Sequence, residues 1–106
     1  MHELVLRIND ADKCYIFAQN AIRRGHDDLA LQAYRRAVDL KAETHEVGSE
    51  AERMALRSFY AYEEALSHGQ RKRKRATGTW QMVNKNGILP TLYKRLQSKD
   101  TDQVNE

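Results

Sequence analysis

The stretch from Asp10 to Glu43 reads DADKCYIFAQNAIRRGHDDLALQAYRRAVDLKAE, and its small and apolar residues recur every three or four positions. This spacing puts them on one face of each of two helices. The residues are Cys14, Phe17, Ala18, Ala21 and Ile22 in the first half, and Ala30, Ala33, Tyr34, Ala37, Val38 and Leu40 in the second. Asp10 offers an N-cap, and Gly25 supplies the left-handed residue that ends the first helix. The stretch therefore predicts a hairpin of two helices.

The flanking residues extend this hairpin to a predicted three-helix body over residues 10–68. Ser49 and Glu52 form a capping box, which predicts the start of the third helix. Its inner face is expected to hold Ala51, Met54, Ala55, Ser58, Phe59, Tyr62 and Leu66. Before the body, Leu4–Ile8 is short and partly β-branched and has no second strand to pair with. Residues 1–9 are therefore predicted to be an extended arm, or a lead-in that packs on the helices.

The C-terminal third differs in composition from the body. Residues 69–78 contain five consecutive cations, whose mutual repulsion favours an open, solvated linker. Residues 79–98 predict two short helices: Thr79 caps the first, Gly87 ends it, and Pro90 lies in the first turn of the second. The polar residues 99–106 are expected to fray. The predicted fold is all-α: a single domain, residues 1–106, formed by a small helical bundle of three main helices, a basic linker and a short helix-turn-helix-like tail.

Residues 11–43 resemble one tetratricopeptide repeat, a helical hairpin with small residues where its two helices cross. Ala18 stands at the small position of the first helix, and Gly25 stands at the turn. Ala30, Tyr34 and Ala37 follow the small, aromatic, small pattern of the second helix. Cys14, Asp27 and Ala42 depart from the pattern, and the sequence shows no second copy. The resemblance implies a helical hairpin with a possible use in protein binding.

The charge is distributed unevenly along the chain. No Asp or Glu occurs between Ala65 and Lys99, and that segment carries a formal charge of +9. Such a field attracts polyanions, which makes nucleic acid, DNA or RNA, the first expected partner. An ordinary charged surface and a nuclear-import signal are the alternatives for the basic run. The candidate nucleic-acid-binding residues are Arg71, Lys72, Arg73, Lys74, Arg75, Thr91, Lys94, Arg95 and Lys99.

The tail has the outline of a small helix-turn-helix, whose second helix could enter a major groove. The expected outward positions are Thr91, Lys94, Arg95, Gln97 and Ser98, and the expected inward positions are Trp80, Val83, Ile88, Leu92 and Leu96. The competing interpretation is that Trp80, the only tryptophan, anchors the tail to the helical body.

Other classes of function find little support in the sequence. The four histidines are scattered and Cys14 is the only cysteine, so neither a metal site nor a disulfide is expected. Adjacent Glu63 and Glu64 do not share a helix face, and no phosphate-cradling glycine loop occurs, so no cofactor and no enzymatic activity are expected. No apolar run approaches the ~20 residues of a membrane span. The lone cysteine suggests a cytoplasmic protein.

These observations predict a small non-enzymatic nucleic-acid-binding or accessory protein. The alternative is a protein–protein interaction module that uses the hairpin of residues 11–43, with the basic tail ancillary. Salt dependence separates the two, because phosphate contacts weaken steeply as salt rises and apolar contacts do not. The choice between DNA and RNA and the oligomeric state are left open by the sequence.

Overall fold

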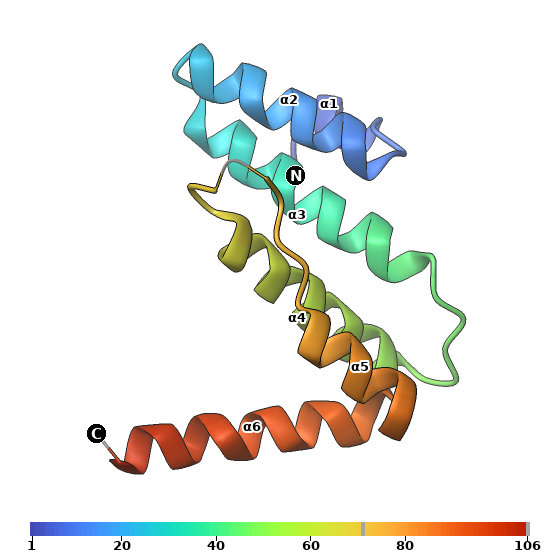
Figure 1. Ribbon diagram of the computed structural model, residues 1–106. Coiled ribbons are helices and arrows are strands. Elements are labelled where there is room, and N and C mark those ends of the chain that lie inside the picture. The colour runs from blue at the N-terminus through green and yellow to red at the C-terminus, as the bar shows by residue number, and fades with distance from the viewer. Residues whose placement is uncertain (71, 106) are drawn as a thin grey trace. The chain divides into compact units, whose positions relative to one another are not determined.

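Helices make up the regular structure of the described part of the chain (Figure 1). The computed structural model describes residues 1–70 and 72–105, with side chains up to position 97. Within this part no strand occurs, so the predicted all-α fold is confirmed. The chain falls into two compact units, Met1–Glu46 and Val47–Glu106. The predicted body of residues 10–68 is divided between them, with its first two helices in one unit and its third in the other.

The first unit contains α1 (Glu3–Leu6), α2 (Ala11–Arg23) and α3 (Asp27–Glu43). The Asp10 carboxylate caps α2 by accepting from the backbone N–H groups of Asp12, at 2.8 Å, and Lys13, at 3.3 Å. Gly25 follows α2 with φ of +79°, a conformation that side chains with a Cβ rarely adopt. The predicted hairpin and its turn are confirmed.

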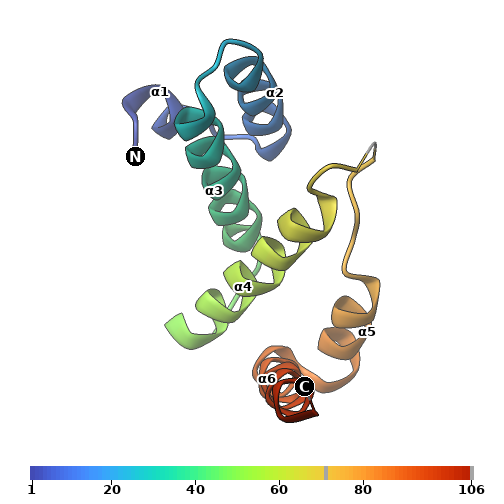
Figure 2. The same cartoon turned by 90° about the vertical axis from the view of Figure 1, so that its left-hand side faces the viewer.

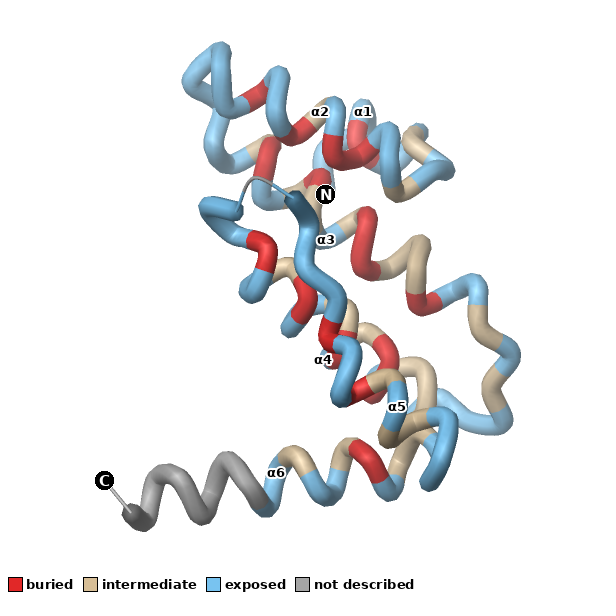
Figure 3. The backbone as a smooth tube through the Cα atoms, viewed as in Figure 1, coloured by how far each residue is buried: buried red, intermediate tan, exposed pale blue. Residues whose placement is uncertain are grey.

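Alanines line the contact between α2 and α3, the most extensive helix contact in the first unit. Ala18, Ala21, Ala30 and Ala33 form one buried cluster, and Cys14, Tyr15 and Ala37 form a second. Figure 3 shows these buried positions recurring along both helices. Because a methyl side chain occupies little space, the two backbones approach closely, and larger residues such as Phe17 and Tyr34 pack at the edges.

The N-terminal residues form a short helix instead of the predicted extended arm. Val5 in α1 is fully buried, and α1 packs on α3. The His2 imidazole accepts from the Leu4 N–H at 3.0 Å, and the Arg36 side chain of α3 donates to the Ile8 carbonyl at 3.1 Å. The extended arm was wrong, and the alternative of a lead-in that packs on the helices is confirmed, because the segment finds its polar and apolar partners on α3.

The second unit contains α4 (Glu50–Ser67), α5 (Thr77–Asn86) and α6 (Ile88–Asn105). The predicted capping box is present: Ser49 Oγ accepts from the Glu52 N–H at 3.2 Å, and Glu52 Oε1 accepts from the Gly48 N–H at 2.9 Å. Both α4 and α5 contact α6, which Figure 2 views almost end-on. Gly87 separates α5 from α6 with φ of +93°.

The buried face of α4 differs from the predicted one. The buried residues are Ala55, Leu56, Phe59, Glu63 and Ser67. Five residues assigned to the inner face are exposed, namely Ala51, Ser58, Met54 at 60%, Tyr62 at 41% and Leu66 at 36%. The prediction followed the spacing of mostly apolar residues, whereas two of the buried positions, Glu63 and Ser67, carry polar side chains that bind the segment after α4.

The C-terminal helices also begin and end at other residues than predicted. α5 begins at Thr77, so Thr79 lies within its first turn and is buried instead of capping the helix. α6 continues to Asn105, past the end expected at residue 98. Residues 99–105 contain neither glycine nor proline, so no residue in that stretch ends a helix by its backbone preference.

The alanine contact between α2 and α3 leads to a stability prediction. Ala37 is fully buried beside Cys14 and Tyr15, so Ala37→Leu should overpack this contact and lower the free energy of unfolding by about 1–3 kcal/mol. Urea denaturation measures the change. Ala61→Leu, at an exposed position of α4, is the matched control and should change stability by no more than about 0.5 kcal/mol. Equal stability of the two variants would show that the contact has room for the larger side chain.

Candidate nucleic-acid interface

The basic segment, residues 72–76, runs back along α4 to the start of α5 (Figure 1). Ser67 of α4 fixes its middle. The Lys74 N–H donates to Ser67 Oγ at 2.8 Å, and the Ser67 hydroxyl donates to the Lys74 carbonyl at 3.3 Å. Both bonds use the backbone of Lys74, so its side chain stays exposed. The predicted open linker is therefore docked on α4 at this point.

Glu63 fixes the end of the basic segment and the start of α5. Its side chain is 3% exposed, and its Oε2 accepts from the Ala76 N–H at 2.8 Å and from Trp80 Nε1 at 2.7 Å. Arg75 Nε lies 3.5 Å from the same oxygen. A buried carboxylate is costly unless charged or polar donors surround it. These three donors meet that requirement and bind three positions of the chain to one side chain of α4.

Glu64 also binds the basic segment, through an ion pair with Arg73. Its side chain is less buried than that of Glu63. Adjacent positions do not share a helix face, yet both glutamates contact the same extended segment: Glu63 binds Arg75, Ala76 and Trp80, and Glu64 binds Arg73.

Trp80 packs on α4, as the anchoring interpretation predicted. Its ring meets the Phe59 ring edge to face at 6.0 Å and lies 4.8 Å from the Tyr60 ring, measured between centroids. The Arg75 guanidinium lies 5.8 Å from the Trp80 ring centre. Burial raises the pKa of the Tyr60 phenol. Arg75 lowers this pKa and Glu63 raises it, both by less than burial does. Aromatic and ionic contacts therefore attach the same segment to α4.

Two candidate binding residues on α6 have structural roles. Thr91, predicted to point outward, is fully buried, and its hydroxyl donates to the Gly87 carbonyl at 2.8 Å. Arg95 is half-buried: its Nη1 donates to Thr79 Oγ1 at 2.7 Å, and its guanidinium lies 4.5 Å from the Tyr62 ring centre. The outward assignment is wrong for Thr91 because the helix backbone satisfies its hydroxyl. Arg95 joins all three helices of the unit.

The other candidate residues lie at the surface or outside the described part. Lys72, Arg73, Lys74 and Arg75 are exposed on the basic segment, and Lys94 is exposed on α6. Lys85, which the prediction did not include, is also exposed, near the end of α5. Arg71 and the side chain of Lys99 lie outside the described residues. The structure thus brings together four consecutive cations on a docked backbone.

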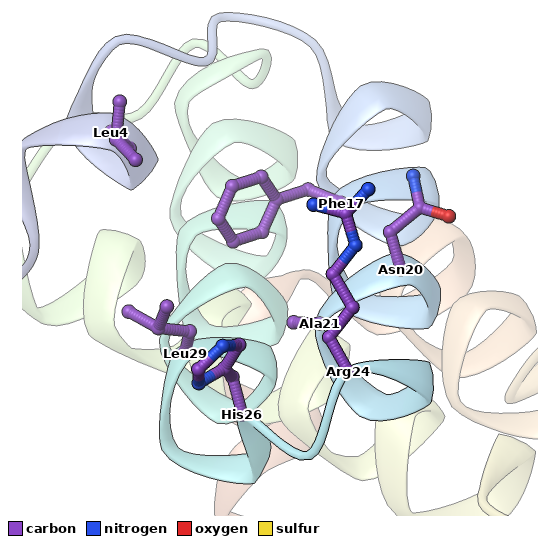
Figure 4. Close-up of a pocket in the computed structure, with 7 residues that line it drawn as sticks. All are labelled: Leu4, Phe17, Asn20, Ala21, Arg24, His26 and Leu29. Atoms are coloured by element: carbon purple, nitrogen blue, oxygen red, sulfur yellow. The ribbon is translucent and has the colours of Figure 1, made fainter.

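The first unit has a groove of about 270 Å³ (Figure 4). Leu4, Phe17, Ala21 and Leu29 supply apolar surface to it, and Asn20, Arg24 and His26 supply polar groups. Its apolar residues come from all three helices of the unit. Sequence patterns did not indicate this groove, because it depends on the position of α1, which was predicted to be extended.

No cluster of histidine, cysteine, aspartate and glutamate suited to a metal occurs among the residues that the structure describes. Cys14 is buried, and burial raises the pKa of its thiol. Within the same described ranges, no helix combines the length and apolar character that crossing a membrane requires.

Comparison with known proteins gives no family for this chain: no family model, curated protein or solved structure matches it.

The Glu63 contacts lead to a second stability prediction. Glu63→Ala removes the acceptor for the Ala76 and Trp80 N–H groups, and should lower the free energy of unfolding by about 2–5 kcal/mol. Urea unfolding followed by the fluorescence of Trp80 measures the loss. Glu64→Ala, which removes the more exposed carboxylate, should cost about 1 kcal/mol or less. A Glu63→Ala protein as stable as Glu64→Ala would show that the buried carboxylate does not secure the segment.

Proposed function

We propose that this chain is a small non-enzymatic nucleic-acid-binding protein, which contacts phosphates through the basic segment and Lys94. The supporting observation is the docking of the basic segment. Its backbone is fixed at Lys74 and Ala76, while the side chains of Lys72, Arg73, Lys74 and Arg75 are exposed. A fixed backbone loses less conformational entropy when its side chains bind a ligand.

The surrounding sequence supports the same proposal. Ala65 to Lys99 contains no carboxylate, so a phosphate chain that follows the basic segment into α5 and the first part of α6 meets no acidic residue from those elements before Asp100. Glu63 and Glu64 of α4 are the nearest acidic groups, and both already bind arginines. Affinity would then come from counterion release as cations neutralise phosphates.

The two lysines of the basic segment provide the direct test. Lys72→Ala with Lys74→Ala should weaken nucleic-acid binding and reduce the log–log salt slope by about two units, one for each lost phosphate contact. Fluorescence anisotropy across a salt titration measures both. The backbone bonds of Lys74 to Ser67 survive this change. Lys13→Ala with Arg23→Ala, two exposed cations of α2, is the matched control and should leave the slope unchanged. Absence of binding at about 50 mM salt would refute the proposal.

A substitution at Glu64 should change nucleic-acid affinity in the opposite direction. Glu64→Gln removes the charge that pairs with Arg73 and should strengthen binding about two- to fivefold at low salt, because Arg73 becomes available to a phosphate. The same titration measures the change, and thermal unfolding confirms that the fold is kept. Weaker binding by this variant would show that the Glu64–Arg73 pair positions the arginine for its ligand instead of competing with it.

The groove of the first unit favours protein interaction as a second candidate function. Its apolar residues, including Phe17 and Leu29, are flanked by Arg24 and His26, which suits an apolar side chain beside acidic residues of a partner. Phe17→Ser should abolish such binding and leave nucleic-acid binding unchanged. Isothermal titration at low and high salt separates the two functions, because the apolar contacts in the groove should make its binding depend less on salt than binding through several phosphates.

A further inference from the structure

The exposed surface of α6 carries an aromatic ring and, at the next position about 100° around the helix, a cation. Tyr93 is 63% exposed, Leu96 is 49% exposed, and Lys94 is exposed as well. Tyr93 and Leu96 are three positions apart, so their side chains are neighbours on the helix surface. We propose that this face binds single-stranded nucleic acid, with an unpaired base stacked on Tyr93. The inference rests on the proposed function and names the form of its ligand.

The contacts within the second unit disfavour readout of a duplex by α6. A recognition helix reads base edges with side chains that donate and accept hydrogen bonds. Two of the residues best suited to that role are engaged in the fold: the Thr91 hydroxyl donates to Gly87, and the Arg95 guanidinium donates to Thr79. Among the exposed residues on the described part of α6, Pro90, Tyr93 and Leu96 offer no bidentate pattern to a base pair, so readout of base edges would fall to Lys94 and Gln97.

The same surface has the chemistry that single strands require. Every unpaired base presents a flat π-face, and proteins that bind single strands stack such faces on exposed aromatic rings beside cations. Tyr93 supplies the ring and Lys94 supplies a cation in the adjacent position. Duplex DNA keeps its base faces stacked on one another, so an exposed tyrosine gains nothing from a duplex unless a base is flipped out.

Charge complementarity identifies the occupant of this apolar face as a polyanion. The described residues of α5 and α6 up to Gln97 include Lys85, Lys94 and Arg95 and no carboxylate. The basic segment of the same unit adds Lys72 and Lys74, whose side chains are exposed. An acid-free surface that combines cations with an exposed aromatic ring matches a ligand with phosphates and unpaired bases.

The experiment compares two tyrosine variants on two ligands. A labelled single strand of about twelve nucleotides, within the site sizes of about 4–16 nucleotides typical of single-strand binders, and the duplex of the same sequence are titrated at low salt by anisotropy. The wild-type chain should bind the single strand more tightly. Tyr93→Leu, which removes the ring, should weaken single-strand binding about tenfold and leave duplex binding within about twofold. Tyr93→Phe, which keeps the ring, should bind like the wild type.

Leu31→Ala, at an exposed apolar position of the first unit, is the control and should bind like the wild type. Equal or tighter binding of the duplex, or unchanged single-strand binding by Tyr93→Leu, would overturn this inference and leave the proposed function standing. Absence of binding to both ligands by the wild-type chain would overturn the proposed function and the inference together.

Discussion

The Glu63 carboxylate is the interaction on which the second unit depends. One oxygen accepts from the backbone of Ala76 and from the indole of Trp80, and Arg75 lies beside it. The Ala76 carbonyl in turn accepts the first hydrogen bond of α5, from the Trp80 N–H at 3.1 Å. A single side chain of α4 therefore determines where the basic segment ends and where α5 begins. α5 has no side-chain cap of its own, which makes this carboxylate the group that orders its start.

A buried charge of this kind imposes a constraint on the whole unit. Removing a carboxylate from water is unfavourable, and the contacts repay this only while all its donors stay in place. The donors belong to a basic segment whose cations repel one another. The segment therefore supplies hydrogen bonds to the carboxylate, and the carboxylate supplies negative charge to the segment. The aromatic rings of Phe59 and Tyr60 around Trp80 shield the contact from water and strengthen it. The same groups therefore hold the basic segment in position and compensate the buried charge of Glu63.

The sequence predicted the helices better than their contacts. Caps and glycines near Asp10, Ser49 and Gly25 are local signals, and these helix ends lie where they were expected. The predictions failed at positions where a polar side chain is buried because the fold supplies its hydrogen-bond partner. The inner face of α4 was misassigned because Glu63 and Ser67 are polar and yet buried. Thr91 was placed outside for the same reason: residue type indicated solvent, while a nearby carbonyl satisfied its hydroxyl.

The two adjacent glutamates of α4 illustrate how burial separates structural from functional charge. Glu63 and Glu64 both meet arginines of the basic segment, yet Glu63 binds two further donors and Glu64 lies closer to solvent. A pair near water is worth little, since water and salt compete for both partners, so a phosphate can replace it at small cost. A buried carboxylate with several donors cannot be replaced in this way without losing the fold around it. In the proposed function the segment exchanges Glu64 for a polyanion, while Glu63 keeps its backbone in place.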